Sequence, residues 1–238
     1  MCTGWNVIVP EDLPHDDLQV VYLLHGLSDN CSNWMRLTSL ERYARLYRVA
    51  VVMPEVQRSY YADMKYGLAY FNYVSQELPE LAHTLFGLPT DREHSLVMGL
   101  SMGGYGALKC GLTYPERYAG IASFSGAVDM VKLRQRFPKE ANIWRESVAI
   151  LGEGLELSPE NDLYRLAEKA ANAPQKPRFF ITCGLQDSVN LLPQNHEFRD
   201  HMNQLGFDVA YDEWDGDHEW KFWDRSLELA FEHFLVKR

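Results

Sequence analysis

Short apolar runs alternate with longer amphipathic stretches along the whole chain. The run at 19–24 is apolar at nearly every position, which is typical of a strand buried on both faces of a parallel sheet. Similar runs predict strands near residues 5–9, 19–24, 48–53, 94–99, 118–124, 178–183 and 207–212. Helical periodicity predicts helices near 32–46, 72–86, 102–113, 159–171, 193–205 and 219–235. This alternation predicts an α/β fold with a mostly parallel, twisted central sheet and helices on both faces.

One connection between predicted strands is much longer than the others. More than fifty residues separate the strand at 118–124 from the strand at 178–183. We expect a single domain over 1–238, with a small cap-like insertion at about 129–176 that takes part in substrate selection. Within the insertion, Ser158 followed by proline is typical of a helix start, with serine at the cap and proline in the first turn.

Composition narrows the class of protein. The formal charge of −10 and the scattered basic residues argue against nucleic acid or an anionic membrane as a partner. There is no apolar stretch long enough to span a bilayer, and the first residues lack the pattern of a secretory signal, so a cytoplasmic location is expected. The four cysteines show no metal-binding spacing, and we expect neither a metal nor another cofactor.

The candidate chemistry begins at residues 99–103, Gly-Leu-Ser-Met-Gly, which follow an apolar run and precede a segment rich in glycine and alanine. The pattern G-x-S-x-G is typical of a nucleophile elbow, where a serine sits on a strained turn from strand to helix. Ser101 is therefore the candidate nucleophile. The backbone N–H of Met102, at the start of the helix, is a candidate donor to an oxyanion.

A serine hydroxyl needs a histidine to accept its proton, and in this architecture the histidine follows the serine in the chain. His218 lies in a polar turn between the strand predicted at 207–212 and the last helix, and it is the candidate base. The other histidines considered fall within helical patterns or precede the serine: His83, His94, His196, His201 and His233.

The acid that orients the histidine is expected at the carboxyl end of a strand. Asp187 follows the buried run at 178–183 and is preferred. Asp215 and Asp217 are close to His218 in sequence, and solvated turn carboxylates are their expected role. Asp129 is the remaining contender.

A second oxyanion donor is expected on the loop after an early strand. His25, Gly26 and Leu27 directly follow the strand at 19–24, and Gly26 allows the backbone to present the N–H of Leu27. His25 is expected to brace this loop by a hydrogen bond. The aromatic loop at 58–66 also lies at a strand end and is expected to line part of the pocket.

Together these motifs resemble the esterase D family of α/β-hydrolases, and most closely its bacterial branch of tributyrin-esterase-like carboxylesterases. The matching segments run through nearly the whole chain: His25-Gly26 with Trp34, Tyr61-Ala62-Asp63 with Tyr66-Gly67, Gly99 to Gly106, Ser123 to Gly126, Cys183-Gly184 with Asp187, and His218-Glu219-Trp220. The resemblance implies an α/β-hydrolase fold and a cofactor-free serine esterase with a preference for acetyl to butyryl esters. It places nucleophile, acid and base on Ser101, Asp187 and His218.

The resemblance also extends to substrate contacts, alternative activities and assembly. Substrate-binding roles are expected for Gly26, Tyr61, Asp63, Tyr66 and Trp220. An S-formylglutathione hydrolase-type thioesterase or an acyltransferase would use the same serine, acid and base. A non-catalytic binding module is disfavoured because the serine and the histidine are both present. The amino end is shorter than is usual in the family, which suggests an exposed sheet edge and a possible homodimer.

Overall fold

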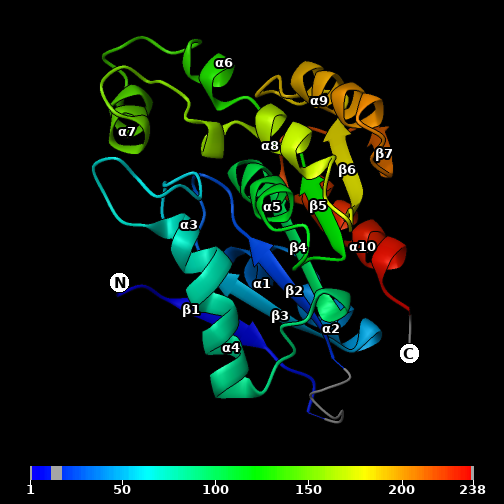
Figure 1. Cartoon of the computed structure of the whole chain (residues 1–238). Helices are drawn as coiled ribbons and strands as arrows, with labels where there is room; N and C mark the ends of the chain where they lie inside the picture. Colours follow the sequence, from blue (N-terminus) through cyan, green and yellow to red (C-terminus); the bar gives the residue numbers. More distant parts are fainter. Residues whose placement is uncertain (1, 12–17, 237–238) are drawn as a thin grey trace.

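A seven-stranded sheet forms the centre of the computed structural model, which describes residues 2–11 and 18–236 (Figure 1). The strand order is β1-β3-β2-β4-β5-β6-β7. β1 pairs antiparallel with β3, and the other neighbouring strands run parallel. The strands are β1 Trp5–Ile8, β2 Gln19–Leu24, β3 Val49–Pro54, β4 Ser95–Leu100, β5 Gly120–Phe124, β6 Arg178–Gly184 and β7 Val209–Trp214. Each predicted strand is present, which confirms the predicted α/β class.

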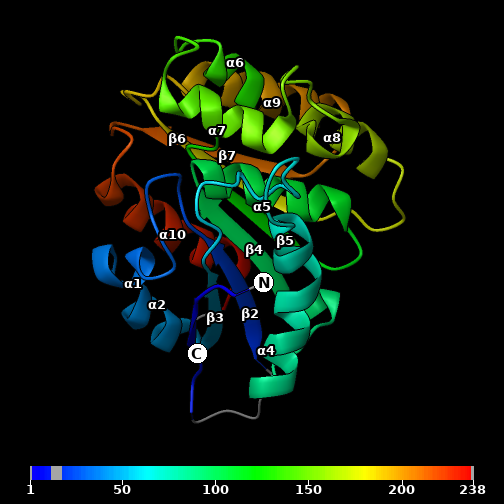
Figure 2. The ribbon, with the colours of Figure 1, turned by 90° about the vertical axis from the view of Figure 1, so that its left-hand side faces the viewer.

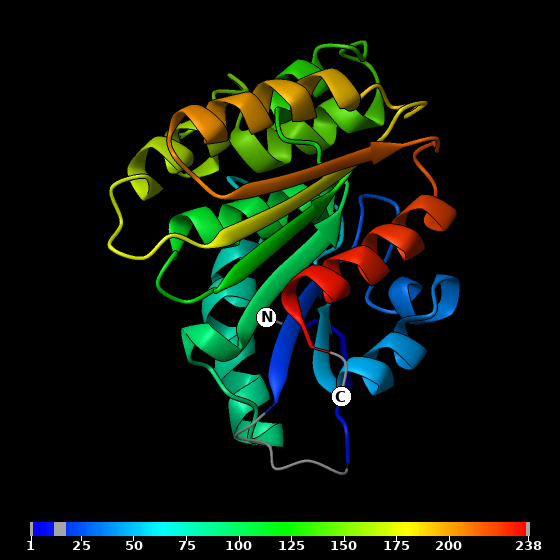
Figure 3. The same ribbon diagram turned by 90° about the vertical axis from the view of Figure 1, so that its right-hand side faces the viewer.

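Helices cover both faces of this sheet (Figure 3). Side chains along β2 alternate between two cores: Val20 and Tyr22 face one, whereas Val21 and Leu23 face the other. The second core is closed by α1 Asn33–Leu37, α2 Leu40–Tyr47 and α10 Trp220–Phe234. The first is closed by α3 Tyr70–Asn72, α4 Leu78–Phe86, α5 Met102–Thr113, α8 Leu163–Ala170 and α9 Leu192–Gln204.

The helix predicted at 32–46 is divided into two. α1 ends at Leu37, the backbone of the following Thr38 is extended, and α2 begins at Leu40. The Thr38 hydroxyl bonds to the Trp34 carbonyl and accepts the N–H of Leu40, while the N–H of Ser39 donates to Asp224 on α10. Side-chain acceptors thus replace helical carbonyls at this point, and the prediction of one continuous helix is wrong.

The helix predicted at 72–86 is also irregular. It consists of α3, a π-helical turn at Tyr73–Glu77 and α4. Proline at position 79 has no N–H to donate to the carbonyl of Ser75. That carbonyl instead accepts Nη1 of Arg117 at 2.7 Å. A hydrogen bond from a distant residue therefore accommodates the break that the proline causes.

The long connection between β5 and β6 contains two helices that periodicity did not predict, α6 Met130–Arg134 and α7 Asn142–Leu151 (Figure 2). The helix predicted at 159–171 is a 3₁₀ turn, Pro159–Asn161, followed by α8. The carboxylate of Asp162 accepts the N–H groups of Tyr164 and Arg165 and so caps α8. Ser158 is the N-cap residue of the 3₁₀ turn with Pro159 in its first position, as predicted, but its hydroxyl accepts Nδ2 of Asn161 and does not bond to a backbone N–H of the turn.

Candidate active site

Ser101 stands between β4 and α5 with φ 51° and ψ −114°, a backbone conformation that non-glycine residues rarely adopt. The neighbouring strand holds it there. The N–H of Ser101 donates to the carbonyl of Phe124 at 2.8 Å, and its carbonyl accepts the N–H of Ala127 at 3.1 Å. The strained turn lifts the hydroxyl above the carboxyl end of the sheet.

The glycines on either side of Ser101 are required by close backbone packing. A Cβ at Gly99 would lie 2.3 Å from the carbonyl oxygen of Gly103. A Cβ at Gly103 would lie 2.3 Å from the carbonyl oxygen of Leu24, at the end of β2. The small residues therefore let α5 approach the sheet closely enough to place the serine.

Gly103→Ala is expected to lower the free energy of unfolding by at least about 2 kcal/mol, because backbone of both β2 and α5 must move to admit the methyl group. Urea unfolding followed by circular dichroism measures the loss. Gly154→Ala is the matched control, since a Cβ there meets nothing nearer than 3.5 Å. Equal stability of the two variants would contradict the packing argument.

Three side chains from separate elements form one hydrogen-bonded chain. His218 Nδ1 lies 2.8 Å from Asp187 Oδ2, and His218 Nε2 lies 3.0 Å from Ser101 Oγ. A carboxylate only accepts, so Nδ1 carries the ring proton and donates to Asp187. Nε2 is then free to accept the hydroxyl proton of Ser101, which is the arrangement a general base requires.

The acid and the base are held by the turns after β6 and β7. The Asp187 side chain is fully buried, and its second oxygen accepts the N–H of Leu191 at 3.2 Å. The turns touch closely: a Cβ at Gly184 would lie 2.3 Å from the Gly216 carbonyl oxygen. The His218 ring packs edge to face on Trp223, with 4.8 Å between the ring centroids, and this contact helps to hold the base in place.

The rival carboxylates occupy other places. Asp217 accepts the N–H groups of Ser188 and His218, both at 2.6 Å, and these bonds lower its pKa. Asp217 is thus a turn carboxylate, as predicted, and through these bonds it also connects the two turns. Asp215 accepts Nε2 of Gln186 at 3.1 Å. Asp129 caps α6 by accepting the N–H of Lys132.

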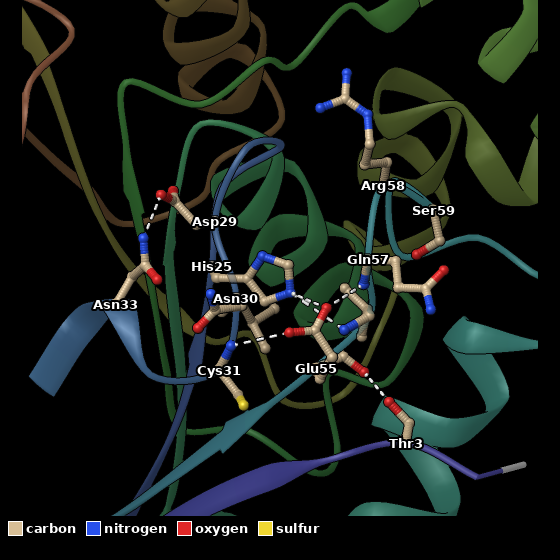
Figure 4. A network of polar contacts seen from close by, with 12 residues as sticks. Thr3, His25, Asp29, Asn30, Cys31, Asn33, Glu55, Gln57, Arg58 and Ser59 are labelled. Carbon is tan, nitrogen blue, oxygen red and sulfur yellow. Dashed lines mark hydrogen bonds and ion pairs between the residues drawn. The ribbon is translucent and has the colours of Figure 1, made fainter. Parts of the chain in front are cut away.

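The loop after β2 carries the candidate oxyanion donor and is braced by His25 (Figure 4). The N–H of Val56 donates to His25 Nε2 at 3.1 Å, so the ring proton is on Nδ1, which donates to the carbonyl of Gly26 at 2.8 Å. The carboxylate of Glu55 lies 3.5 Å from Nε2. Both ring nitrogens are engaged in fixing the loop, as expected for a structural histidine. Met102 is the first residue of α5, so its N–H has no intrahelical acceptor.

A cavity of about 570 Å³ opens beside Ser101 and His218. Gly26, Leu27 and Trp220 line it, as predicted from the sequence. Residues that periodicity did not identify come from the insertion: Leu133, Phe137 and Ile143. The insertion therefore forms one wall of this cavity, which we call the active-site pocket.

Three predicted pocket residues lie elsewhere. Tyr61 is fully buried, and its hydroxyl donates to the carbonyl of His25. Asp63 is exposed and accepts the N–H of Asn72, the last residue of α3. Tyr66 is 58% exposed. These three residues do not line the described cavity, so it gives no support to their predicted substrate-binding roles. Tyr60 is the residue of this loop whose ring reaches the pocket.

The charged groups of the active-site pocket are mainly acidic. Asp29 and Glu219 line it together with Arg58. The Arg58 guanidinium is already paired, donating to both carboxylate oxygens of Glu146 at 2.7 and 3.0 Å. Burial raises the pKa of Asp29, against the opposing effects of His25 and the hydrogen bond from Asn33. The pocket therefore presents unpaired carboxylates and no unpaired cation among the described residues that line it.

The sequence of the chain matches a known protein family and a named relative. Residues 3–234 match the family model "Esterase", described as "Putative esterase". An acetyl esterase from Caldicellulosiruptor saccharolyticus is 31% identical over 231 residues, covering 93% of this chain and 85% of the relative. The chain belongs to this esterase family. The predicted resemblance to esterase D-like proteins is confirmed at the family level.

Solved structures agree with the family assignment. The substrate-bound structure of fluorophosphonate-binding serine hydrolase F from Staphylococcus aureus has a TM-score of 0.88 at 32% identity, covering 99% of this chain and 93% of the other. An S-formylglutathione hydrolase from the same organism has a TM-score of 0.86 at 32% identity, covering 98% and 93%. The esterase has the α/β-hydrolase fold and is a serine hydrolase of carboxylic esters.

The described part of the esterase lacks two further classes of feature. No group of three or more histidine, cysteine, aspartate or glutamate side chains there could hold a metal ion. None of its described helices is long and apolar enough to cross a membrane.

Lys109, on α5 of the esterase, supports the loop after β2 through Tyr61, and the sequence analysis did not identify it. It is 1% exposed, and its Nζ donates to the carbonyl of Tyr61 at 3.1 Å and to Asn161 Oδ1 at 2.6 Å. Tyr61 in turn donates to the His25 carbonyl at 3.0 Å. The lysine lies in a glycine- and alanine-rich helix, so only its interruption of an otherwise uncharged segment could have marked it.

Burial lowers the pKa of Lys109 to about 8. In the unfolded chain the pKa of this lysine has its higher ordinary value. Above pH 8 the unfolded chain therefore binds more protons than the folded state, and the contribution of Lys109 to the free energy of unfolding rises with pH. We expect the free energy of unfolding of the wild type, relative to Lys109→Met, to rise by about 1 kcal/mol between pH 7 and 9. Urea titrations at each pH measure it. Lys169→Met, at an exposed site on α8, should show no such trend; a flat difference for Lys109→Met as well would refute the assignment.

Proposed function

We propose that this esterase hydrolyses uncharged short-chain esters, acetyl to butyryl, through an acyl-enzyme formed on Ser101. The observation that carries the proposal is the hydrogen-bonded chain from Asp187 through His218 to Ser101, which ends in a pocket lined by apolar side chains and unpaired carboxylates. The named acetyl esterase among the relatives supports the acyl class.

In the first half-reaction, Ser101 Oγ attacks the ester carbonyl carbon while His218 Nε2 takes the hydroxyl proton. The carbonyl electron pair moves onto oxygen, giving a tetrahedral oxyanion. The N–H groups of Leu27 and Met102 face this charge in the proposed mechanism, each contributing on the order of 3 kcal/mol. As the intermediate collapses, the bond to the alcohol breaks and His218 returns the proton to the leaving oxygen.

The second half-reaction repeats these steps with water. His218 Nε2 removes a proton from water as its oxygen attacks the acyl carbon, and the same two N–H groups bind the second oxyanion. Collapse releases the carboxylic acid and returns the proton to Ser101 Oγ. Throughout, Asp187 holds the tautomer with the proton on Nδ1 and stabilises the transient imidazolium.

A thioesterase acting on S-formylglutathione is the alternative, and the structural similarity to an S-formylglutathione hydrolase favours it. The charges of the pocket argue against it. The glutathionyl group carries two carboxylates and one ammonium, a net negative charge, whereas Asp29 and Glu219 line the pocket and Arg58 is held by Glu146. Repulsion between like charges should therefore favour an uncharged ester over the thioester.

Asp29→Asn is expected to raise kcat/KM for S-formylglutathione about fivefold, an electrostatic gain of about 1 kcal/mol, and to change kcat/KM for p-nitrophenyl acetate less than twofold. The ratio of the two rates is measured for each variant. Asp91→Asn, which removes a charge at a distant exposed position, is the control. A thioester rate unchanged by Asp29→Asn would contradict the electrostatic argument.

The overall proposal is tested by hydrolysis of p-nitrophenyl esters from acetyl to octanoyl. We expect turnover that falls steeply beyond butyryl. Fast turnover of S-formylglutathione with slow turnover of every p-nitrophenyl ester would establish the thioesterase instead. Formation of a transfer product when an alcohol or sugar is added would reveal an acyltransferase.

A further inference from the structure

Asp217, which has no part in the proposed reaction steps, lies directly before His218 in the turn after β7. Its Oδ1 accepts two backbone N–H groups at 2.6 Å, one from Ser188 and one from His218. The first N–H belongs to the peptide that follows Asp187, and the second belongs to the peptide that leads into His218. One carboxylate oxygen thus bonds to the chain beside the acid and to the chain beside the base.

A short ladder of backbone hydrogen bonds joins the two turns, but it stops before the acid and the base. Its last rung is the N–H of Gln186, which donates to the carbonyl of Gly216 at 3.0 Å. The next N–H, that of Asp187, donates back within its own turn. In the part of the chain that the structure describes, no further backbone bond joins this turn to the turn of His218. The Asp217 side chain makes the link at the level of the acid and the base.

Gln186 also links the turns through its side chain, but one residue earlier. Its Oε1 accepts the N–H of Gly216 at 2.7 Å, and its Nε2 donates to Asp215 at 3.1 Å. These bonds reinforce a rung that the backbone already makes. The Asp217 carboxylate instead bonds to N–H groups that the ladder does not reach, so the two side chains have different consequences for the site.

We propose that Asp217 is a positioning residue that holds His218 at the distance and angle from Asp187 that proton transfer requires. This inference rests on the proposed function, in which His218 is the base. The imidazole lies 2.8 Å from the acid and 3.0 Å from Ser101 Oγ, so a shift of its backbone lengthens at least one of these hydrogen bonds. Misplacement by about 1 Å can lower a rate about 10²-fold. Asp217 acts through His218 and does not line the active-site pocket.

Asp217→Ala should lower kcat for p-nitrophenyl acetate about 30-fold and change KM less than twofold, because the base shifts while the pocket keeps its lining. Asp217→Asn should recover at least one third of the wild-type kcat, since an amide oxygen can accept the same two N–H groups. Gln186→Ala is the matched comparison between the same turns and should lower kcat less than fivefold. Steady-state kinetics of the four proteins measure both parameters.

Thermal unfolding of the same variants separates positioning from a general loss of stability. Asp217→Ala and Gln186→Ala should lower the Tm to a similar extent, because each removes side-chain hydrogen bonds from the same pair of turns. A merely structural role would make the loss of kcat follow the loss of Tm. Equal loss of kcat in these two variants, a rise in KM that accounts for the effect, or an Asp217→Asn variant as impaired as Asp217→Ala would each overturn the proposal.

The proton on His218 Nδ1 gives a readout that needs no substrate. It donates to a carboxylate, and a charge-assisted hydrogen bond of this kind gives a proton resonance at low field. The resonance should be present in the wild type and Gln186→Ala, and it should shift or broaden in Asp217→Ala. An unchanged resonance in Asp217→Ala would overturn the proposal. If the wild type does not hydrolyse p-nitrophenyl acetate, the proposed function fails, and this resonance still decides whether Asp217 positions His218.

Discussion

Ser101→Ala is expected to lower kcat for p-nitrophenyl butyrate by on the order of 10⁵-fold or more, and to abolish the burst of p-nitrophenol in the first turnover. The loss is this large because alanine has no hydroxyl to attack the ester, so the acyl-enzyme cannot form. His218 and the oxyanion donors then have no covalent intermediate to stabilise or break down. Stopped-flow absorbance at enzyme concentrations near those of the substrate measures the burst and the steady rate together.

The serine variant should remain folded, which separates lost chemistry from lost structure. Ser101 has positive φ, a conformation that alanine tolerates no better than serine, so its circular dichroism and urea midpoint should stay close to those of the wild type. Ser188→Ala, in the turn that carries Asp187, is a matched hydroxyl control, because it removes a hydroxyl that interacts with Asp217 and keeps the backbone N–H that donates to the same carboxylate. Wild-type turnover by Ser101→Ala would disprove the proposed nucleophile.

Asp187→Asn should lower kcat by roughly 10⁴-fold with little change in KM. An amide at this position can donate a hydrogen bond to Nδ1, which favours the tautomer with the ring proton on Nε2. That nitrogen then faces Ser101 as a donor and cannot accept the hydroxyl proton. The pocket is unaffected because Asp187 lies behind the imidazole, so ground-state binding should persist. Steady-state kinetics with p-nitrophenyl acetate separate the two parameters.

Asp215→Asn is the matched control for this prediction, since Asp215 is exposed and its carboxylate accepts a hydrogen bond from Gln186, outside the chain from Asp187 to Ser101. Its kcat should remain within about twofold of the wild type, as is usual for a surface substitution. Loss of turnover in Asp215→Asn with retention in Asp187→Asn would reverse the assignment of the acid.

Much of the scaffold follows from local sequence. A run of apolar residues as continuous as β2 can be buried only between two layers, so the strands were predicted to within two residues of their observed ends. The turn at Ser101 was equally predictable, because few residue combinations allow a strained backbone so close to another strand. The same holds for His25, whose place directly after a strand and before a glycine indicated a bracing role.

Helix interruptions depended on partners distant in sequence. The break between α1 and α2 is stabilised by Asp224 from the last helix, and the irregular turn before α4 by Arg117. Periodicity reports which face of a helix is apolar, but it contains no information about a side chain that arrives from elsewhere to satisfy a freed carbonyl.

The sequence by itself determined the layered α/β architecture, the strained serine turn and the candidate acid and base, because each depends on local backbone preferences and on the fixed direction of parallel strands. Tertiary structure alone decided that Tyr60 lines the pocket while Tyr61 bonds to His25, and that Asp217 joins two turns. It also decided that the Arg134 guanidinium is buried with no hydrogen-bond partner among the described residues. These features depend on how distant segments pack against one another, and burial, charge pairing and side-chain direction in loops exist only once that packing is complete.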